Sequence, residues 1–302
     1  MAFETPSPSE LADVFGLLAN DLRVAVVREL WLAFPDPLSF SALRERVGGP
    51  DSGTFNYHLN ELQPAFVESV EDRYTLTYAG RQVVGVAVSG RLDGRDGPTV
   101  DATPAGECLS CPATTELRYE AGVATVACPE CGLLAAETAV PPAVIQSAER
   151  DPAERESSRR ESVVRVVSDH LRRTAERLAR GFCTHCDGRV DATLVGDTDD
   201  EAVAHRRELG VRFDCRVCGA EPRLNVGAVL LADPAVVSLL TDAGVDLRER
   251  YAWELAPLLD PESARTTNEG DESRLRVTFA VDDERLVVTV DDTASVVETE
   301  RV

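Results

Sequence analysis

The eight cysteines of this sequence form four pairs, and each pair has two residues between its members. The pairs are Cys108/Cys111, Cys128/Cys131, Cys183/Cys186 and Cys215/Cys218. Two thiolates at this spacing can face one metal ion, and two such pairs complete a tetrahedral site with metal–sulfur bonds of about 2.3 Å. We therefore expect two Zn²⁺ sites of four cysteines each. Because four protein ligands leave no open coordination position, both zinc sites are expected to be structural.

Other thiol chemistry uses the same spacing. A redox switch, an iron–sulfur cluster and a rubredoxin-type iron site are the competing interpretations. Gly132 and Gly219 each follow the last cysteine of a set. Glycine readily adopts the left-handed conformation that directs backbone N–H groups toward sulfur, which favours zinc knuckles.

Catalytic motifs are missing from the sequence. None of the four histidines pairs with a convincing nucleophile or base, and there is no glycine-rich phosphate loop, HExxH or GxSxG motif. We therefore expect no enzymatic activity.

The segments between the cysteine pairs predict the elements that position them. "TTELRYEAGVATVA", between the first two pairs, predicts two strands around a turn. Between the last two pairs, "RVDATLV" and "GVRFD" are predicted strands, and an acidic segment separates them. A hairpin that brings two knuckles together is the plan of a zinc ribbon. We predict one ribbon over residues 108–138. The second lies within 157–302, together with a connecting helix and a C-terminal region of helix and β-hairpin. Residues 91–107 and 139–156, rich in Gly, Pro and polar residues, are predicted linkers.

The connecting helix, at about 157–180, has apolar residues at helical spacing. Its stripe consists of Val164, Val167, Leu171 and Leu178, with Ala175 beside it. We expect this stripe to pack within the chain, and pairing with a second copy is the alternative. The same stretch is the one net-basic part of the chain, and its arginines are expected to face solvent rather than nucleic acid.

Residues 9–90 read as helices around a β-hairpin. On the helix that begins at Asp51 or Ser52, Phe55, Leu59 and Leu62 share one side. The opposite side carries Ser52, Thr54, Asn56, Tyr57 and Asn60. Short polar groups and amides on a helix suit base edges and phosphates in the major groove. Arg73, expected at the hairpin tip, is a candidate for a phosphate or the minor groove.

This order of elements, and the stretch "SGTFNYHLNELQPAFVESVEDRYTLTYAGRQVV", resemble the ArsR-type winged helix-turn-helix transcription regulators in their archaeal versions. The resemblance implies a DNA-binding fold that commonly dimerises. Metal-sensing members carry cysteines on the helix before the recognition helix, whereas "SFSALRERVG" has none. Metal-responsive repression is therefore not carried over to this chain.

The charge of the chain is extreme. The chain has 53 acidic residues and 31 basic residues, all of them arginine, which gives a net charge of −22. Dense carboxylates and the loss of lysine are expected of an extreme halophile. Residues 1–90 hold six arginines against twelve acidic residues, which opposes DNA binding by counterion release. The N-terminus has no export signal and the apolar runs are too short for a membrane span, so we expect a cytoplasmic protein.

The sequence thus predicts an α+β protein, in which an N-terminal winged helix-turn-helix precedes two zinc-ribbon-like modules. The expected function is a DNA-binding transcription regulator whose structural zinc ribbons serve stability, dimerisation or docking. Double-stranded DNA is the expected partner, and a second copy of the chain and the transcription machinery are the further candidates. The alternatives are an interaction module of that machinery without sequence-specific DNA binding, and a thiol redox sensor.

Overall fold

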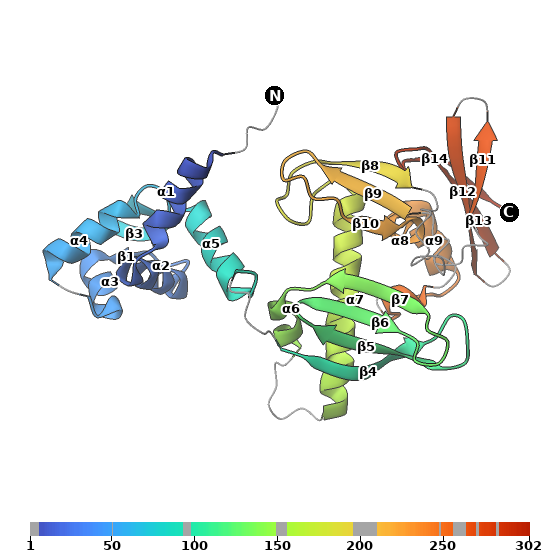
Figure 1. The fold of residues 1–302 in the computed structure, drawn as a ribbon, viewed down its shortest axis with the longest axis horizontal. Coiled ribbons are helices and arrows are strands. Elements are labelled where there is room, and N and C mark those ends of the chain that lie inside the picture. Colours follow the sequence, from blue (N-terminus) through green and yellow to red (C-terminus); the bar gives the residue numbers. More distant parts are fainter. Residues whose placement is uncertain are drawn as a thin grey trace. The chain divides into compact units, whose positions relative to one another are not determined.

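The computed structural model describes residues 6–49, 51–92, 98–148, 156–195, 210–247, 249–255, 264–269, 272–281 and 284–302. The chain divides into two compact units, the first formed by Met1–Asp96 with Pro141–Ala143, and the second by Gly97–Val140 with Val144–Val302. Each unit combines helices with small antiparallel sheets, so the α+β class is confirmed (Figure 1). No helix among the described residues is both long and apolar enough to cross a bilayer.

The first unit contains five helices and one small sheet within its described residues. Its elements are α1 (Pro8–Leu18), α2 (Asp21–Ala33), β1 (Leu38–Ser39), α3 (Phe40–Val47), α4 (Ser52–Glu61), β2 (Val67–Val70), β3 (Arg73–Leu76) and α5 (Tyr78–Val88). The strands pair in the order β1–β3–β2. Side chains of Asn20, Ser39, Asp51 and Thr77 cap the N-termini of four helices, which fixes where each begins.

The core of the first unit joins three helices to the sheet. Val26 and Leu30 of α2 are buried with Leu43 of α3 and with Phe55 and Leu59 of α4. Leu62, Phe66, Val67 and Leu76 complete this cluster. Helix α1 contributes no fully buried residue, and the side chain of Phe15 is 69% exposed. Helix α4 therefore packs against this core on one side, and the residues of its other side are exposed to solvent.

The second unit begins with a four-stranded sheet. Its elements are β4 (Val100–Glu107), β5 (Thr114–Glu120), β6 (Val123–Ala127) and β7 (Leu134–Ala139), paired in chain order, followed by α6 (Pro142–Ser147) and α7 (Glu156–Ala179). The sheet and α7 share a core that includes Leu117, Tyr119, Val164, Val167 and Trp253. The predicted apolar stripe on α7 thus packs within the chain.

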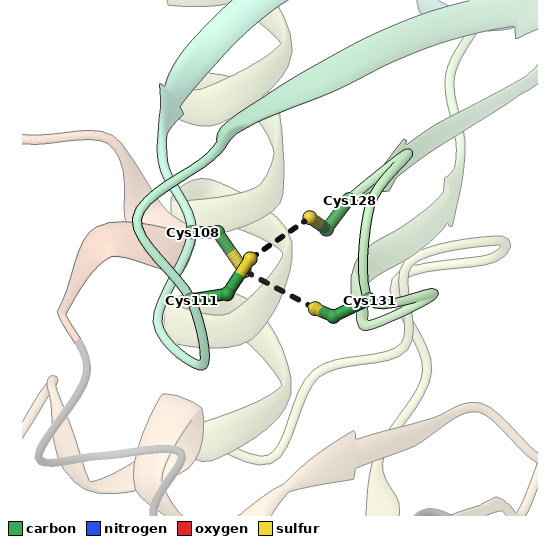
Figure 2. Close-up of side chains that lie close together, drawn as sticks. All are labelled: Cys108, Cys111, Cys128 and Cys131. Atoms are coloured by element: carbon green, nitrogen blue, oxygen red, sulfur yellow. Dashed lines mark hydrogen bonds between the residues drawn. The ribbon is translucent and has the colours of Figure 1, made fainter.

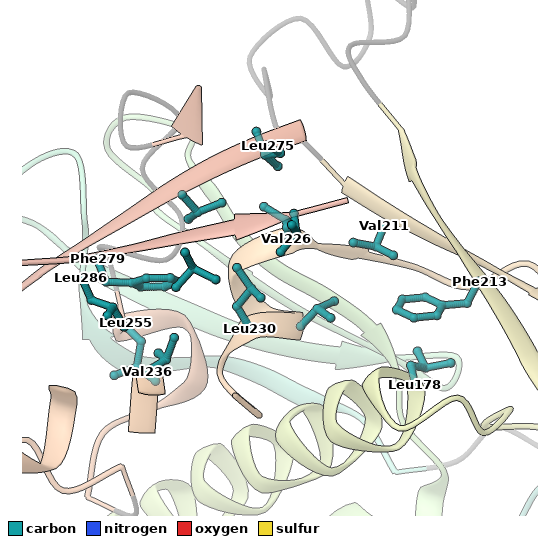
Figure 3. Close-up of a cluster of buried hydrophobic side chains, with 14 of the residues drawn as sticks. Leu178, Val211, Phe213, Val226, Leu230, Val236, Leu255, Leu275, Phe279 and Leu286 are labelled. Carbon is teal, nitrogen blue, oxygen red and sulfur yellow. The ribbon is translucent and has the colours of Figure 1, made fainter. Parts of the chain in front are cut away.

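The remainder of the second unit surrounds the second cysteine set. Its elements are β8 (Val190–Val195), β9 (Gly210–Cys215), β10 (Arg223–Asn225), α8 (Val226–Leu230), α9 (Pro234–Asp242), the 3-10 helix η2 (Ala252–Glu254), β11 (Ala264–Glu269), β12 (Glu272–Val281), β13 (Glu284–Val290) and β14 (Val296–Arg301). One apolar cluster joins Leu178 of α7, Phe213 of β9, Val236 of α9 and Phe279 of β12 (Figure 3). The predicted C-terminal hairpin is β12–β13, the middle of a four-stranded sheet.

The predicted linkers are wrong in part. Residues 100–107 of the first predicted linker form β4, and residues 142–147 of the second form α6, with Ile145 buried. Strand β4 contains Pro104 and Gly106, which normally interrupt strands. It lies at the edge of its sheet and has two register shifts against β5, so both residues are tolerated. Composition alone cannot reveal a strand whose pairing partner comes later in the chain.

The arginines of α7 make several contacts within the chain. Arg165 lies over the ring of Tyr251 at 4.8 Å and donates to the carbonyl of Glu249 at 3.0 Å. Arg177 pairs with Asp187, next to the second cysteine set. The expectation of a solvated arginine face is therefore only partly correct, because these side chains fasten the helix to its neighbours.

Candidate functional site

The first cysteine set joins two loops of the four-stranded sheet. Cys108 and Cys111 lie between β4 and β5, and Cys128 and Cys131 lie between β6 and β7 (Figure 2). The four sulfurs lie within 4.8 Å of one another, with distances of 3.6 Å for both Cys108–Cys131 and Cys111–Cys128. Tetrahedral coordination at about 2.3 Å per bond separates sulfurs by about 3.8 Å, so the set has the dimensions of a metal site.

The second set repeats this arrangement. Cys183 and Cys186 precede β8, and Cys215 and Cys218 lie at the end of β9 and just after it. The Cys183–Cys218 and Cys186–Cys215 sulfurs are 3.7 Å and 3.6 Å apart. A disulfide requires about 2.05 Å, and all eight cysteines are free thiols. Each of the two predicted groups of four is thus brought together, and each could hold one metal ion.

Backbone hydrogen bonds shape the knuckles. The N–H of Cys128 donates to the carbonyl of Leu133 at 2.7 Å, and that of Cys215 donates to Ala220 at 3.0 Å. Gly132 and Gly219 have φ values of +74° and +70°, as predicted from their positions. At His185, it is the backbone N–H, not the ring, that donates to the Cys183 sulfur at 3.3 Å.

The thiols within each set differ in pKa. The N–H of Cys131 contributes most to lowering the pKa of Cys128 to about 7. Burial opposes ionisation of Cys215, but the N–H groups of Cys218 and Val217 and the neighbouring thiols lower its pKa to about 6. The N–H of Ala113 favours ionised Cys111, yet burial and the other three thiols raise its pKa to about 12. One thiolate thus forms readily, and a cation is needed to ionise the rest.

Burial differs between the two sets. Cys183 and Cys215 belong to the apolar cluster of the second half of the unit, whereas in the first set only Cys128 is buried. The second set is therefore part of a core, and the first set lies at the end of a sheet. Four sulfurs around each centre leave no place for a substrate, so both sites suit a structural role.

Helix α4 carries the predicted DNA-contacting residues. All five outward residues, Ser52, Thr54, Asn56, Tyr57 and Asn60, are exposed. Phe55, Leu59 and Leu62 on the opposite side are completely buried. The two-sided character predicted for this helix is therefore present.

The N-terminus of α4 carries a carboxylate. Asp51 accepts hydrogen bonds from the N–H groups of Gly53 and Thr54 and from the Thr54 hydroxyl, at 2.9, 3.1 and 2.9 Å. These bonds, led by the Thr54 N–H, hold the pKa of Asp51 below its usual value. The cap thus uses donors that a phosphate would otherwise contact, and it places a negative charge there.

The prediction for Arg73 is wrong in its placement. The tip of the β2–β3 hairpin is Glu71–Asp72, both with positive φ, and Arg73 is the first residue of β3. Its Nε donates to the carbonyl of Pro37 at 3.0 Å. Both tip residues adopt the left-handed conformation that a two-residue hairpin loop requires. The charge of the tip opposes phosphate contact.

Sequence reasoning missed the residues that support the first cysteine set. The indole of Trp253 donates a hydrogen bond to the carbonyl of Ala105. The hydroxyl of Thr115 donates a second hydrogen bond, of 2.9 Å, to the same carbonyl. The partner of a single tryptophan more than a hundred residues away leaves no local signal in the sequence.

Two families match the chain, and their limits follow the two compact units. A domain of unknown function (DUF7347) matches residues 11–87, and a domain of unknown function (DUF7351) matches residues 105–296. The second match spans both cysteine sets, so they belong to one domain. No curated protein and no solved structure matches the chain.

Proposed function

The chain belongs to the family described as a domain of unknown function (DUF7351), and we propose that it is a DNA-binding transcription regulator. In this proposal the first unit is a winged helix-turn-helix, in which α4 enters the major groove and β2–β3 is the wing. The second unit holds two structural zinc ions.

The observation that carries the proposal is the outward face of α4. Asn56, Tyr57 and Asn60 are exposed on a helix whose other side is anchored by fully buried residues. The helix is preceded by α3 and followed by the β2–β3 hairpin, the order in which winged helices present a recognition helix. Asparagine can form two hydrogen bonds with adenine, so Asn56 and Asn60 are the proposed base-reading residues.

Zinc is the proposed metal because of the ligand chemistry. Four thiolates at tetrahedral spacing suit zinc, and the backbone N–H groups that face the sulfurs reduce their negative charge. A zinc ion in each set would fasten two loops in a unit whose small sheets offer limited apolar area.

One observation favours a second candidate function, docking to a protein of the transcription machinery. The α4 cap Asp51 and the hairpin tip Glu71–Asp72 are acidic, and Tyr57 on the outward face of α4 is 59% exposed. An acidic surface with an exposed aromatic side chain suits a basic protein partner better than a phosphate backbone.

The proposal is tested by DNA binding of the full chain in molar KCl. The zinc-loaded protein is first used to select the genomic DNA fragments that it binds. Its affinity for the selected sequence is then measured by mobility shift. We expect the double variant Asn56→Ala/Asn60→Ala to lose about 1–3 kcal/mol of binding free energy for each base contact removed. Ser9→Ala on α1, an exposed residue outside both α4 and the β2–β3 wing, is the matched control and is expected to bind normally.

Two results would contradict DNA binding. The first is the absence of any enriched sequence with protein whose zinc content and helicity are intact. The second is equal binding by the double variant and the control. Capture of a basic protein through Tyr57 and Glu71 would then support the docking function.

A further inference from the structure

A cavity of about 480 Å³ lies inside the second unit. Its walls come from β7, the C-terminal half of α7, and the β10–α8 segment, and residues of α9 and η2 complete the lining. None of the eight cysteines lines it. Pockets for small molecules occupy about 300–1,000 Å³ and are mostly apolar with few polar groups, so this cavity has the size of a ligand site.

Small side chains create the space. The walls include six alanines, Ala135, Ala136, Ala175, Ala228, Ala232 and Ala252. Leu171, Trp253 and Leu255 provide larger apolar surface. Protein interiors are normally packed to the density of organic crystals, so an unfilled space of this size is uncommon. Contact between water and the methyl groups of the walls is unfavourable. An apolar molecule of suitable size would therefore be favoured in this cavity over water.

The charged residues of the lining are mainly cations. Arg172, Arg180 and Arg223 line the cavity with Glu137 and Glu176. Glu176 is already paired with Arg180 at 2.7 Å. In a chain of net charge −22, a cavity with more arginines than carboxylates is unexpected.

Arg223 is the accessible cation of this group. It is exposed, and it makes no ion pair with any other residue in the described ranges. Across the ladder its Cα partner is Arg212, whose own charge is paired with Asp214 at 3.0 Å. The rim of the cavity therefore offers a guanidinium that can bind a carboxylate through two parallel hydrogen bonds.

Arg172 adds a second cation to the lining, and it is less exposed than Arg223. It donates to the carbonyls of Leu247 and Arg250, and its Nε is buried without a hydrogen-bond partner among the described residues. Burial is the main cause that lowers its pKa, although the charges of Asp169 and Asp246 act in the opposite direction. The half-buried guanidinium remains charged, so a nearby anion would be favourable.

We propose that this cavity binds a small amphipathic carboxylate. Its apolar part would lie between the alanine-lined walls and Trp253, and its carboxylate would pair with Arg223 at the rim of the cavity. This ligand site goes beyond the proposed function and does not depend on DNA binding.

Trp253 makes the test direct. The chain has two tryptophans, and in Trp31→Phe the remaining one lines the cavity. Decanoate is titrated into the zinc-loaded full-length variant in molar KCl, below the concentration at which decanoate aggregates. We expect a saturable change in emission, and at least fivefold weaker binding of decanol, which has the same chain without charge.

Three further substitutions, in the Trp31→Phe background, separate the parts of the proposal. Arg223→Gln is expected to weaken decanoate at least fivefold and to leave decanol unchanged, because it removes only the charge partner. Ala228→Phe fills the space and is expected to weaken both compounds. Arg118→Gln, an exposed arginine of β5 outside the cavity, is the matched control and is expected to bind both normally. Zinc content and far-ultraviolet circular dichroism establish that each variant is folded.

Each contrary result has a defined meaning. No saturable signal, checked by calorimetry with the wild-type protein, would overturn the ligand site. Undiminished binding by Ala228→Phe would place the ligand elsewhere and overturn it as well. Equal affinity for decanoate and decanol would overturn the carboxylate preference. DNA binding can succeed or fail in any of these cases, so the two proposals are judged separately.

Discussion

The indole Nε1–H of Trp253 donates a 2.6 Å hydrogen bond to the carbonyl oxygen of Ala105, and both residues are buried. The two positions are 148 residues apart. Ala105 lies on β4, three residues before the first cysteine, and Trp253 lies in η2. The sheet that carries the first cysteine set is therefore completed by a segment that follows the second set.

Loss of this bond should destabilise the second unit. Trp253→Phe keeps an aromatic ring beside Tyr251 but removes the donor and part of the packing. We expect a decrease of about 1–3 kcal/mol in the free energy of unfolding, measured by denaturant titration. Tyr251→Phe, which removes only a hydroxyl and keeps the stacked ring, is the control and should change little. Equal stability of the two variants would mean that the hydrogen bond contributes nothing.

Two glycines provide a matched test of the contact between β4 and η2. A Cβ at Gly106 would lie 2.1 Å from Oε1 of Glu254, whereas one at Gly122 would meet no atom within 4 Å. Both glycines have positive φ, +94° and +83°. We expect Gly122→Ala to cost about 1 kcal/mol of strain and Gly106→Ala to cost more, as measured by thermal unfolding. Similar losses for both would show that the Glu254 side chain moves away freely.

Each cysteine set should retain one zinc ion. We expect about two zinc per chain by elemental analysis, and about one in Cys128→Ser and in Cys215→Ser. The Cys215 variant should lose more stability, because that cysteine belongs to an apolar core. Ser110→Ala, in the first knuckle, should keep both ions, since only its backbone N–H donates to sulfur. Iron in place of zinc, or zinc released by mild oxidant, would instead favour the iron or redox interpretation.

Metal affinity should rise with pH. Thiols such as Cys111 and Cys218, with pKa values of about 12, are protonated near neutrality and must lose protons when a metal binds. Below pH 7 the thiol of Cys128 also becomes protonated, and below pH 6 so does that of Cys215. Zinc retention against a chelator should therefore fall progressively from pH 8 to pH 5. A flat profile would argue against thiolate ligation.

The charge of Asp51 should influence DNA binding without determining the fold. Asn is as good an N-cap as Asp, so Asp51→Asn should keep α4 intact while removing a carboxylate from its N-terminus. We expect tighter DNA binding and a steeper salt dependence, measured by mobility shift at several KCl concentrations. Unchanged affinity would mean that the DNA backbone does not approach this end of α4.

The same residue predicts a pH effect on stability. The pKa of Asp51 is lowered in the folded protein, so its contribution is complete above the usual carboxyl pKa and is lost as the pH falls through the lowered value. Asp51→Asn should remove this acid-dependent part of the stability. Acid titrations of the wild type and the variant, followed by circular dichroism, would reveal the difference.

Local spacing made the metal sites and the helix faces predictable. The cysteine pairs, the start of α4 at Asp51 or Ser52, and the buried side of α4 all depend on residues within a few positions of one another. Strand β4 and the bond from Trp253 were not predictable, because both depend on partners distant in the chain. Arg73, expected at the hairpin tip, instead begins β3 directly after the acidic tip Glu71–Asp72, a difference of one residue.

The long range of the Trp253–Ala105 bond also has a consequence for biosynthesis. A growing chain emerges from the ribosome N-terminus first, so β4 is available well before its indole donor has been translated. Contacts of high sequence separation form late and slowly. The first unit, whose core cluster extends only to Val84, can fold while translation continues. The second unit must wait for nearly the whole chain, with its thiols accessible to metal and oxidant in the meantime.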